Sequence, residues 1–226
     1  MAIAIHFGAP APVGSGTLAT DGSQSAADEL FGKSKWWGFP DMPEDLEYPA
    51  VPVPGEFDDP LTFICQIRCA DLAPCDPAGQ LPHKGMLYFF ASLDYFLGNL
   101  DAVSAPGLGE WETPYFRVLY SPVCTGLHTH SVFYEDGSPA CLPPRGISFA
   151  EAPDSCDAGG YFKLLGQPFY EEVSQELPGM ISLLQIDEND DWGLRFFDCG
   201  MLNFLISPTD LAARRWSAVR CWLHSA

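Results

Sequence analysis

The chain has 226 residues, of which 47% are hydrophobic and 13% aromatic, so it can bury a sizeable core. Its 30 acidic residues exceed its 11 Lys and Arg residues and give a formal net charge of −19. This charge argues against binding to nucleic acid or to an anionic membrane, and it favours a basic protein partner. The alternative is that the acids serve solubility alone.

The sequence predicts a cytoplasmic protein. No uninterrupted apolar stretch reaches the roughly eighteen residues that a membrane-spanning helix needs. Residues 1–7 carry no Lys or Arg and form too short an apolar run for a signal peptide. In the cytoplasm the eight cysteines are expected to be free thiols.

In chain order, residues 1–33 are expected to form an N-terminal arm, extended or mobile, with a short helix over residues 26–31. Six prolines between residues 40 and 60 argue against any regular element there. Strands are predicted where short apolar runs are rich in aromatic and branched residues, at 61–67, 85–91, 115–120, 131–134, 180–186, 194–197, 201–206 and 217–224. A capping box at residues 207–210 predicts a helix that ends near Arg215.

Three short phrases occur twice in the same order. The first is Lys-apolar-apolar-Gly-x-Pro, the second Gln-Ile and the third Gly-Met-Leu-x-Phe, at residues 35–40, 66–67 and 85–89 and again at 163–168, 185–186 and 200–204. This repetition predicts an internal duplication.

With its short strands and few helices, the chain is expected to have an α+β fold of two related halves, mostly antiparallel sheet with few short helices. We expect a single body over residues 34–226, made of pseudo-repeats at about 34–138 and 160–226 that a loop at 139–159 joins.

The repeated phrases also carry a family resemblance. Residues 34–43 resemble the opening motif of the YwqG-like family of uncharacterised proteins, and residues 163–168 resemble its second motif. Residues 183–187, 197–204 and 207–213 resemble its C-terminal block. The resemblance implies an α+β body of two related halves and no established reaction. Because some members of that family are encoded beside secreted-toxin genes, it also implies that a toxin-neutralising role is open.

Two positions depart from the motifs of that family. Phe162 stands where the family usually has His before the Lys of the second motif, so any role of that His is absent here. Phe196-Phe197-Asp198 stands where the family usually has Trp-Gly-Asp.

An acidic loop in the second pseudo-repeat has no counterpart in the first. Asp187, Glu188, Asp190 and Asp191 surround Trp192. An aromatic anchor with an acidic rim is typical of protein interfaces, so these five residues are the predicted partner-binding site. The alternative is a solvated loop between two strands.

Metal, cofactor and nucleophile motifs give no positive prediction. The spacing of Asp187, Asn189, Asp191 and Asp198 approaches that of a calcium loop, but Trp192 stands where the sharp turn requires Gly. The sequence His128-Thr129-His130 lacks the further ligands that zinc requires. With no phosphate loop or serine nucleophile elbow, the sequence predicts no metal, no cofactor and no catalytic residue.

The repeated Gln and Lys residues leave two interpretations open. Gln66 and Gln185 lie inside apolar strands, where a buried amide must find partners, most simply as a clamp to neighbouring backbone. Lys35 and Lys163 are expected to bind carboxylates across the repeat interface. The alternative is that all four line a ligand pocket between the two halves.

The leading prediction is therefore a non-catalytic acidic binding protein, most specifically an immunity-type inhibitor that occludes the cationic active cleft of a toxin such as a nuclease. The alternative is an enzyme or small-ligand-binding protein with a pocket between the halves. A purely structural module is the third reading.

Overall fold

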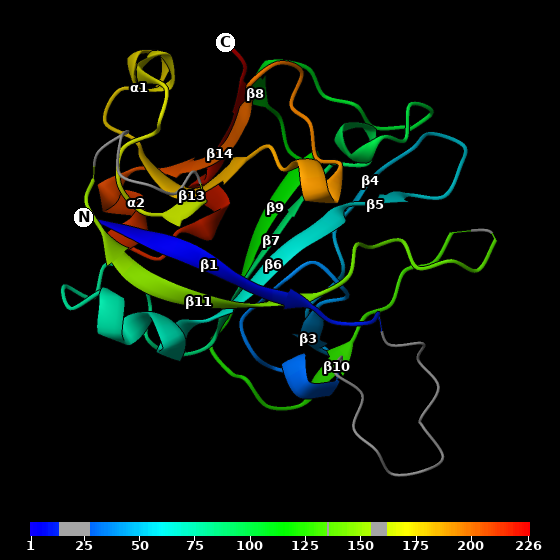
Figure 1. Ribbon diagram of the computed structural model, residues 1–226, viewed down its shortest axis with the longest axis horizontal. Helices are drawn as coiled ribbons and strands as arrows, with labels where there is room; N and C mark the ends of the chain where they lie inside the picture. Colours follow the sequence, from blue (N-terminus) through cyan, green and yellow to red (C-terminus); the bar gives the residue numbers. More distant parts are fainter. Residues whose placement is uncertain (14–27, 135, 155–161) are drawn as a thin grey trace.

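The computed structural model describes residues 1–13, 28–134, 136–154 and 162–226 (Figure 1). Eleven strands form one continuous antiparallel sheet. Across the sheet their order is β8 (Gly109–Trp111), β15 (Arg220–His224), β14 (Met201–Ile206), β13 (Ile181–Asp187), β12 (Lys163–Leu164), β1 (Ala2–Pro10), β11 (Arg145–Ala152), β2 (Lys35–Trp36), β6 (Thr62–Arg68), β7 (Met86–Ala91) and β9 (Phe116–Ser121).

The remaining elements are short. Two small two-stranded sheets pair β3 (Asp41–Pro43) with β10 (Leu127–Thr129) and β4 (Ala50–Val51) with β5 (Asp59–Pro60). The described residues hold two α-helices, α1 (Glu171–Glu176) and α2 (Pro208–Ala212). Short 3-10 helices lie between strands, namely η1 (Asp28–Leu30), η2 (Cys69–Cys75), η3 (Tyr95–Leu97), η4 (Asp190–Trp192) and η5 (Trp216–Ala218). No helix in the described ranges has the length and apolar character to cross a membrane.

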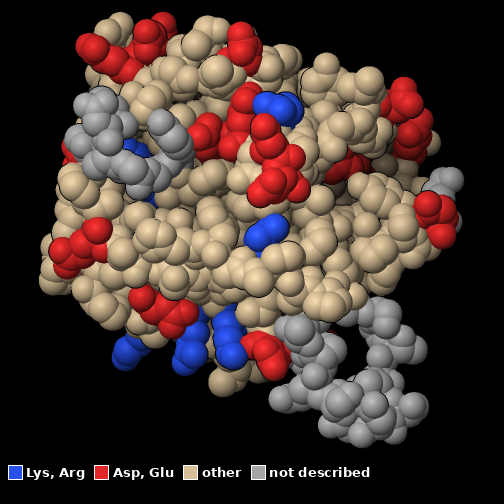
Figure 2. Space-filling view, viewed as in Figure 1, with Lys and Arg blue, Asp and Glu red and all other residues tan. Residues whose placement is uncertain are grey.

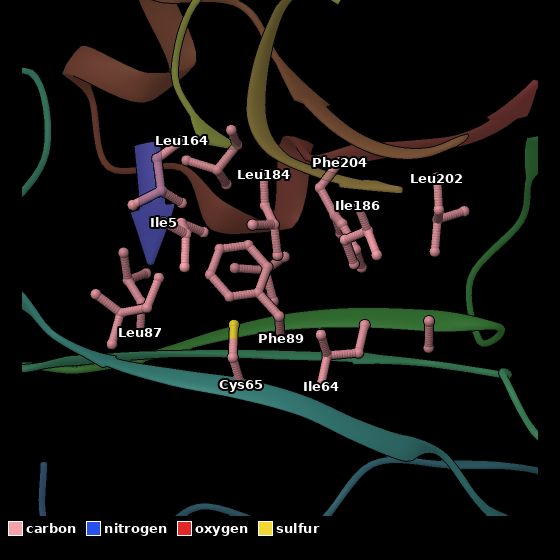
Figure 3. Packing of buried hydrophobic residues seen from close by; sticks show 14 of the residues in the cluster. Ile5, Ile64, Cys65, Leu87, Phe89, Leu164, Leu184, Ile186, Leu202 and Phe204 are labelled. Carbon is pink, nitrogen blue, oxygen red and sulfur yellow. The ribbon is translucent and has the colours of Figure 1, made fainter. Parts of the chain in front are cut away.

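The large sheet curls until its two edges approach each other. The edge strands β8 and β9 are joined only by residues 112–115, and both line one cleft. The curvature turns one part of the sheet over another, so that β13 and β14 face β6 and β7, as the labelled side chains from both sides show (Figure 3). The interior is thus enclosed by two walls of a single, nearly closed sheet.

The enclosed space is filled by apolar side chains. Leu184, Ile186 and Phe204 project from one wall toward Ile64 and Phe89 on the other (Figure 3). Successive side chains of a strand point to opposite faces, except at the register shifts in β6 and β13, where the consecutive residues Ile64 and Cys65, and Leu183 and Leu184, all belong to the interior cluster. Each fully buried side chain of this size contributes about 1.5–3 kcal/mol, so this filled interior is the main source of stability.

Two smaller apolar clusters cover the outer faces of the walls. One covers β6 and β7 and includes Met42, Phe63 and Tyr88. The other lies between α1 and β14 and includes Val173 and Leu205. Both faces of the strands are therefore buried, which explains why β7 is a continuous apolar run and why β14 is apolar apart from Asn203, rather than alternating.

The predicted fold class is wrong. The chain is mostly antiparallel sheet with two short helices in its described part, and its strands do not divide into two halves of a duplication. β1 precedes both predicted halves yet lies in the middle of the sheet, and β8, from the first predicted half, pairs with β15 at the end of the chain. One interleaved sheet cannot be cut at residues 139–159, because β11 lies within that range and pairs with β1 and β2.

The repeated phrases share a local backbone geometry rather than marking halves. Lys35 pairs with Gln66, and Lys163 pairs with Gln185. The second apolar residue of each phrase has a φ of 59°, and the Gly that follows has a φ of 75° in the first phrase and 86° in the second. Two consecutive left-handed residues need Gly at the second position, which explains this part of the repeated phrase.

Other predicted elements are partly confirmed. The strands at 61–67, 85–91, 115–120, 180–186, 201–206 and 217–224 correspond to β6, β7, β9, β13, β14 and β15. The ranges 131–134 and 194–197 hold only isolated bridges, while the Pro-rich segment contains three strands of two or three residues. Residues 2–10 of the expected arm form β1, and of the expected helix at 26–31 the part up to residue 27 lies outside the described residues. The Ser207 hydroxyl caps α2 by accepting from the Asp210 N–H, as predicted.

Candidate functional site

The first repeated phrase carries a buried ion pair. Lys35 Nζ lies 2.7 Å from Asp41 Oδ2, and the two residues are 5% and 1% exposed. Burial lowers the pKa of Lys35, and the adjacent Asp41 carboxylate opposes this shift. The carboxylate also accepts from the Gly32 N–H and the Thr129 hydroxyl, each at 2.9 Å. A buried charge with this many partners is a structural group.

Gln66 completes this cluster as a clamp. Its Oε1 accepts from the Asp41 N–H at 2.8 Å, and its Nε2 donates to the Lys33 carbonyl and to Asp41 Oδ2, both at 2.9 Å. The amide therefore joins three separate backbone segments, β6, β3 and the turn before β2. This contact pattern matches the interpretation of Gln66 as a backbone clamp.

In the second phrase Gln185 makes a similar contact to backbone. Gln185 Oε1 accepts from the Phe169 N–H at 2.8 Å, and Phe169 stands six residues after Lys163, as Asp41 stands six after Lys35. Lys163 Nζ donates to the Gln167 carbonyl at 2.6 Å.

The four side chains do not line a common pocket. Cys65 and Leu184 point into the filled interior from opposite walls (Figure 3), so the following residues, Gln66 and Gln185, point outward and away from each other. A pocket between two halves, the alternative for ligand binding or catalysis, is therefore replaced by packed apolar side chains.

Trp192 is not the exposed anchor that the sequence predicts. It is 8% exposed and packs edge-on against Phe7, Trp37 and Phe162, with ring centroids 5.0, 5.7 and 5.3 Å away. The guanidinium of Arg145 lies 5.9 Å from the centroid of its ring. Trp192 therefore joins η4 to the core, and the acidic residues before it are the part of the loop that faces outward.

The acids of this loop have different environments. Glu188 is tied down, because its Oε1 accepts from the N–H groups of Phe196 at 2.7 Å and Gly200 at 3.1 Å. Burial, together with the nearby Glu188 charge, raises the pKa of Asp187 to about 6. Asp190 Oδ1 lies 2.8 Å from Arg195, and both Asp190 and Asp191 are exposed. Only these last two carboxylates are available to a partner.

The calcium interpretation of this loop gains no geometric support. The Asn189 side chain accepts from the Trp192 N–H and so caps η4. Asp187 accepts from the N–H of Glu188. Among the residues that the structure describes, no three His, Cys, Asp or Glu side chains are placed to hold a metal ion, and the pair His128 and His130 gains no third ligand.

Surface charge is distributed rather than collected in one patch. On the face in Figure 2, acidic side chains occur in several separate groups, with basic side chains among them and along the lower edge. A shallow cleft of about 510 Å³ has Asp45, Glu47 and Asp58 in its lining. A second cleft, of about 350 Å³, lies beside the ion pair between Glu110 and Arg220, and it is lined by residues of both edge strands, β8 and β9.

Sequence reasoning missed the two most exposed aromatic side chains among the described residues, Phe57 at 97% and Phe197 at 52% exposure. Phe57 is an isolated aromatic within the Pro-rich acidic segment at 52–60, a context that itself disfavours burial. That signal was available in the sequence.

The fold and these side-chain clusters define an antiparallel β protein with a filled interior and polar side chains that clamp neighbouring backbone. The chain belongs to the family described as a domain of unknown function (DUF1963), whose model matches residues 34–140 and 147–224. No curated protein matches the chain.

Proposed function

We propose that the chain is a non-catalytic binding protein for a basic protein, most specifically an immunity-type inhibitor that covers the cationic active cleft of a toxin such as a nuclease. The observation that carries the proposal is a net charge of −19. A cleft built to bind phosphates offers the complementary charge, and opposite charges accelerate association. Such an encounter would take place in the cytoplasm, and the motifs at residues 34–43 and 163–168 favour a YwqG-like protein within the family.

The proposed contact surface on the acidic loop consists of Asp190, Asp191 and Phe197. Both carboxylates are exposed, and Phe197 is half-exposed in the same connection between β13 and β14. Because Trp192 is buried, Phe197 takes the place of the apolar anchor in this proposal. Its ring rests edge-on against Phe96, at 5.5 Å between centroids, so little side-chain freedom is lost when a partner covers it.

The experiment starts from capture of a basic protein from the native host at low salt with the full chain as bait. Association of the purified partner is then followed by stopped-flow fluorescence over a range of salt concentrations. The double variant Asp190→Asn, Asp191→Asn is expected to associate more slowly and with a weaker salt dependence.

The matched control removes two charges elsewhere. Glu171→Gln with Glu172→Gln, at two exposed carboxylates of α1, is expected to leave association close to that of the unsubstituted protein. The proposal fails if no basic protein is retained. If the two double variants associate at the same rate and with the same salt dependence, the acidic loop is not the contact surface.

A further inference from the structure

The larger of the two surface clefts has an apolar wall. Its volume is about 510 Å³, and it lies between the outer face of β9, residues 45–50 and the loop that joins β4 to β5. Leu46, Tyr48 and Leu119 line it and pack against the apolar cluster outside β6 and β7. Because Tyr48 also donates to the Leu61 carbonyl at 2.8 Å, this wall is fixed in place.

The rim of the cleft carries uncompensated negative charge. Asp45, Glu47 and Asp58 are exposed, and within the described residues none of them forms a salt bridge. Arg117 is the single basic side chain in the lining. Three carboxylates around one guanidinium leave the cleft complementary to a cationic side chain.

An exposed aromatic residue stands beside this rim. Phe57 immediately precedes Asp58 and is 97% exposed. Its loop is closed by the pairing of Val51 with Asp59, and prolines at positions 52 and 54 limit the conformations of the loop. An aromatic side chain on a conformationally restricted loop binds a partner at a low cost in conformational entropy.

We propose that this cleft binds an extended segment of a basic protein, in which a Lys or Arg side chain lies between the three carboxylates and an adjacent apolar side chain packs on Phe57. The occupant follows from charge complementarity combined with the apolar wall. A small polycation would use the charge alone, and an apolar ligand would leave the carboxylates unpaired. The inference rests on the proposed function for the basic nature of the partner, and it adds a second contact surface to the acidic loop.

The test is a titration of the ¹⁵N-labelled full chain, followed by NMR, with a capped peptide in which Arg and Leu alternate. Spermine and a peptide in which Gln replaces Arg serve as comparison ligands. The Arg peptide is expected to shift the amide signals of residues 45–50, 56–59 and 117–119. The Gln peptide is expected to cause no shift, and spermine is expected to bind at least about tenfold more weakly than the Arg peptide.

Two variants separate the apolar and the charged contributions. Phe57 is 97% exposed, so the variant Phe57→Ser loses little packing. It is expected to lower the affinity of the chain for the Arg peptide by about tenfold. The triple variant Asp45→Asn, Glu47→Gln, Asp58→Asn is expected to lower the affinity for the Arg peptide further than Phe57→Ser does. A matched triple on α1, Glu171→Gln, Glu172→Gln and Glu176→Gln, removes the same charge and is expected to bind like the unsubstituted chain.

The proposal is overturned if the signals shift elsewhere, if spermine binds as tightly as the peptide, or if the α1 triple weakens binding as much as the cleft triple. It is also overturned if an intact basic partner binds the chain in the same way with and without the cleft substitutions, an outcome that leaves the proposed function standing. Absence of any basic partner removes the proposed function, while the peptide titration still decides whether the cleft has this binding property.

Discussion

The segments around Lys35 and Lys163 begin with the same phrase and pair with their neighbouring strands in the same register. They differ at the sixth residue after the Lys. Asp41 places a carboxylate against Lys35, whereas at Phe169 the backbone N–H donates to Gln185 Oε1. The two segments therefore share the backbone turn and the Gln clamp, and at the first of them the sixth residue also supplies the Asp41 carboxylate.

This comparison separates what a local phrase specifies from what its surroundings specify. The phrase determines two left-handed residues and one strand pairing. It does not determine the next layer, which at Lys35 is the pair of β3 and β10. Similar local sequence is consequently compatible with a sheet that does not divide into halves.

The largest expected effect is at the ion pair. Lys35→Met leaves the Asp41 carboxylate buried without its counter-charge and should lower the free energy of unfolding by about 3–5 kcal/mol. Urea unfolding followed by Trp fluorescence measures it. The double variant Lys35→Met, Asp41→Asn removes both charges and should recover part of the loss. A single variant as stable as the unsubstituted chain would show that the ion pair is not required.

A smaller effect on stability is expected from Ala substitutions at Gly38 and Gly166, the glycines of the two phrases, and its size should differ between them. Both have positive φ, so Ala at either position should cost about 1–2 kcal/mol in backbone strain. A Cβ on Gly38 would lie 2.7 Å from the ring of Pro144, which moves only together with its backbone. On Gly166 it would lie 2.3 Å from Asp154 Oδ1, a side-chain atom that can rotate away at the cost of its hydrogen bond from the Gln167 N–H. Gly38→Ala should therefore lower the thermal midpoint more than Gly166→Ala. The reverse order would contradict the difference in their surroundings.

The smallest effect on stability is expected at the ends of β6 and β13, the strands that carry Gln66 and Gln185. Arg68 pairs with Met86 at the end of β6, and Asp187 pairs with Met201 at the end of β13. Burial raises the pKa of Asp187 to about 6, so the folded state holds this proton more tightly than the unfolded state. The contribution of Asp187 to stability should therefore fall as pH rises from about 4 to about 6.

Asp187→Asn should remove this contribution and reduce the loss of stability across that pH range. Urea midpoints at several pH values measure it, with Asp191→Asn as a control for the loss of one exposed charge. Parallel profiles for Asp187→Asn and the unsubstituted chain would contradict the assignment.

Much of the strand content could be predicted from the sequence. Apolar runs such as residues 61–67 and 201–206 have strand length and composition, and both are strands. β1 could not be identified, because it depends on pairing with β11 and β12 across long sequence separations. The duplication was inferred from phrases that encode one turn geometry, which recurs without a repeated fold.

The site was harder to predict for a similar reason. The acidic neighbours of Trp192 suggested exposure, yet Phe7 and Phe162 come from other parts of the chain to bury its ring. Convergence of this kind is a property of the fold. The clamp role of Gln66 was predictable, since an amide inside an apolar strand must find polar partners nearby.

The central claim is that this protein binds a basic partner through its surface, because its interior is filled by packed side chains. The decisive measurement is the activity of the purified basic partner on its own substrate while this protein is titrated into it. Activity that falls to near zero at an equimolar ratio and returns as salt is added is the predicted result. A partner that is fully bound yet fully active would contradict occlusion.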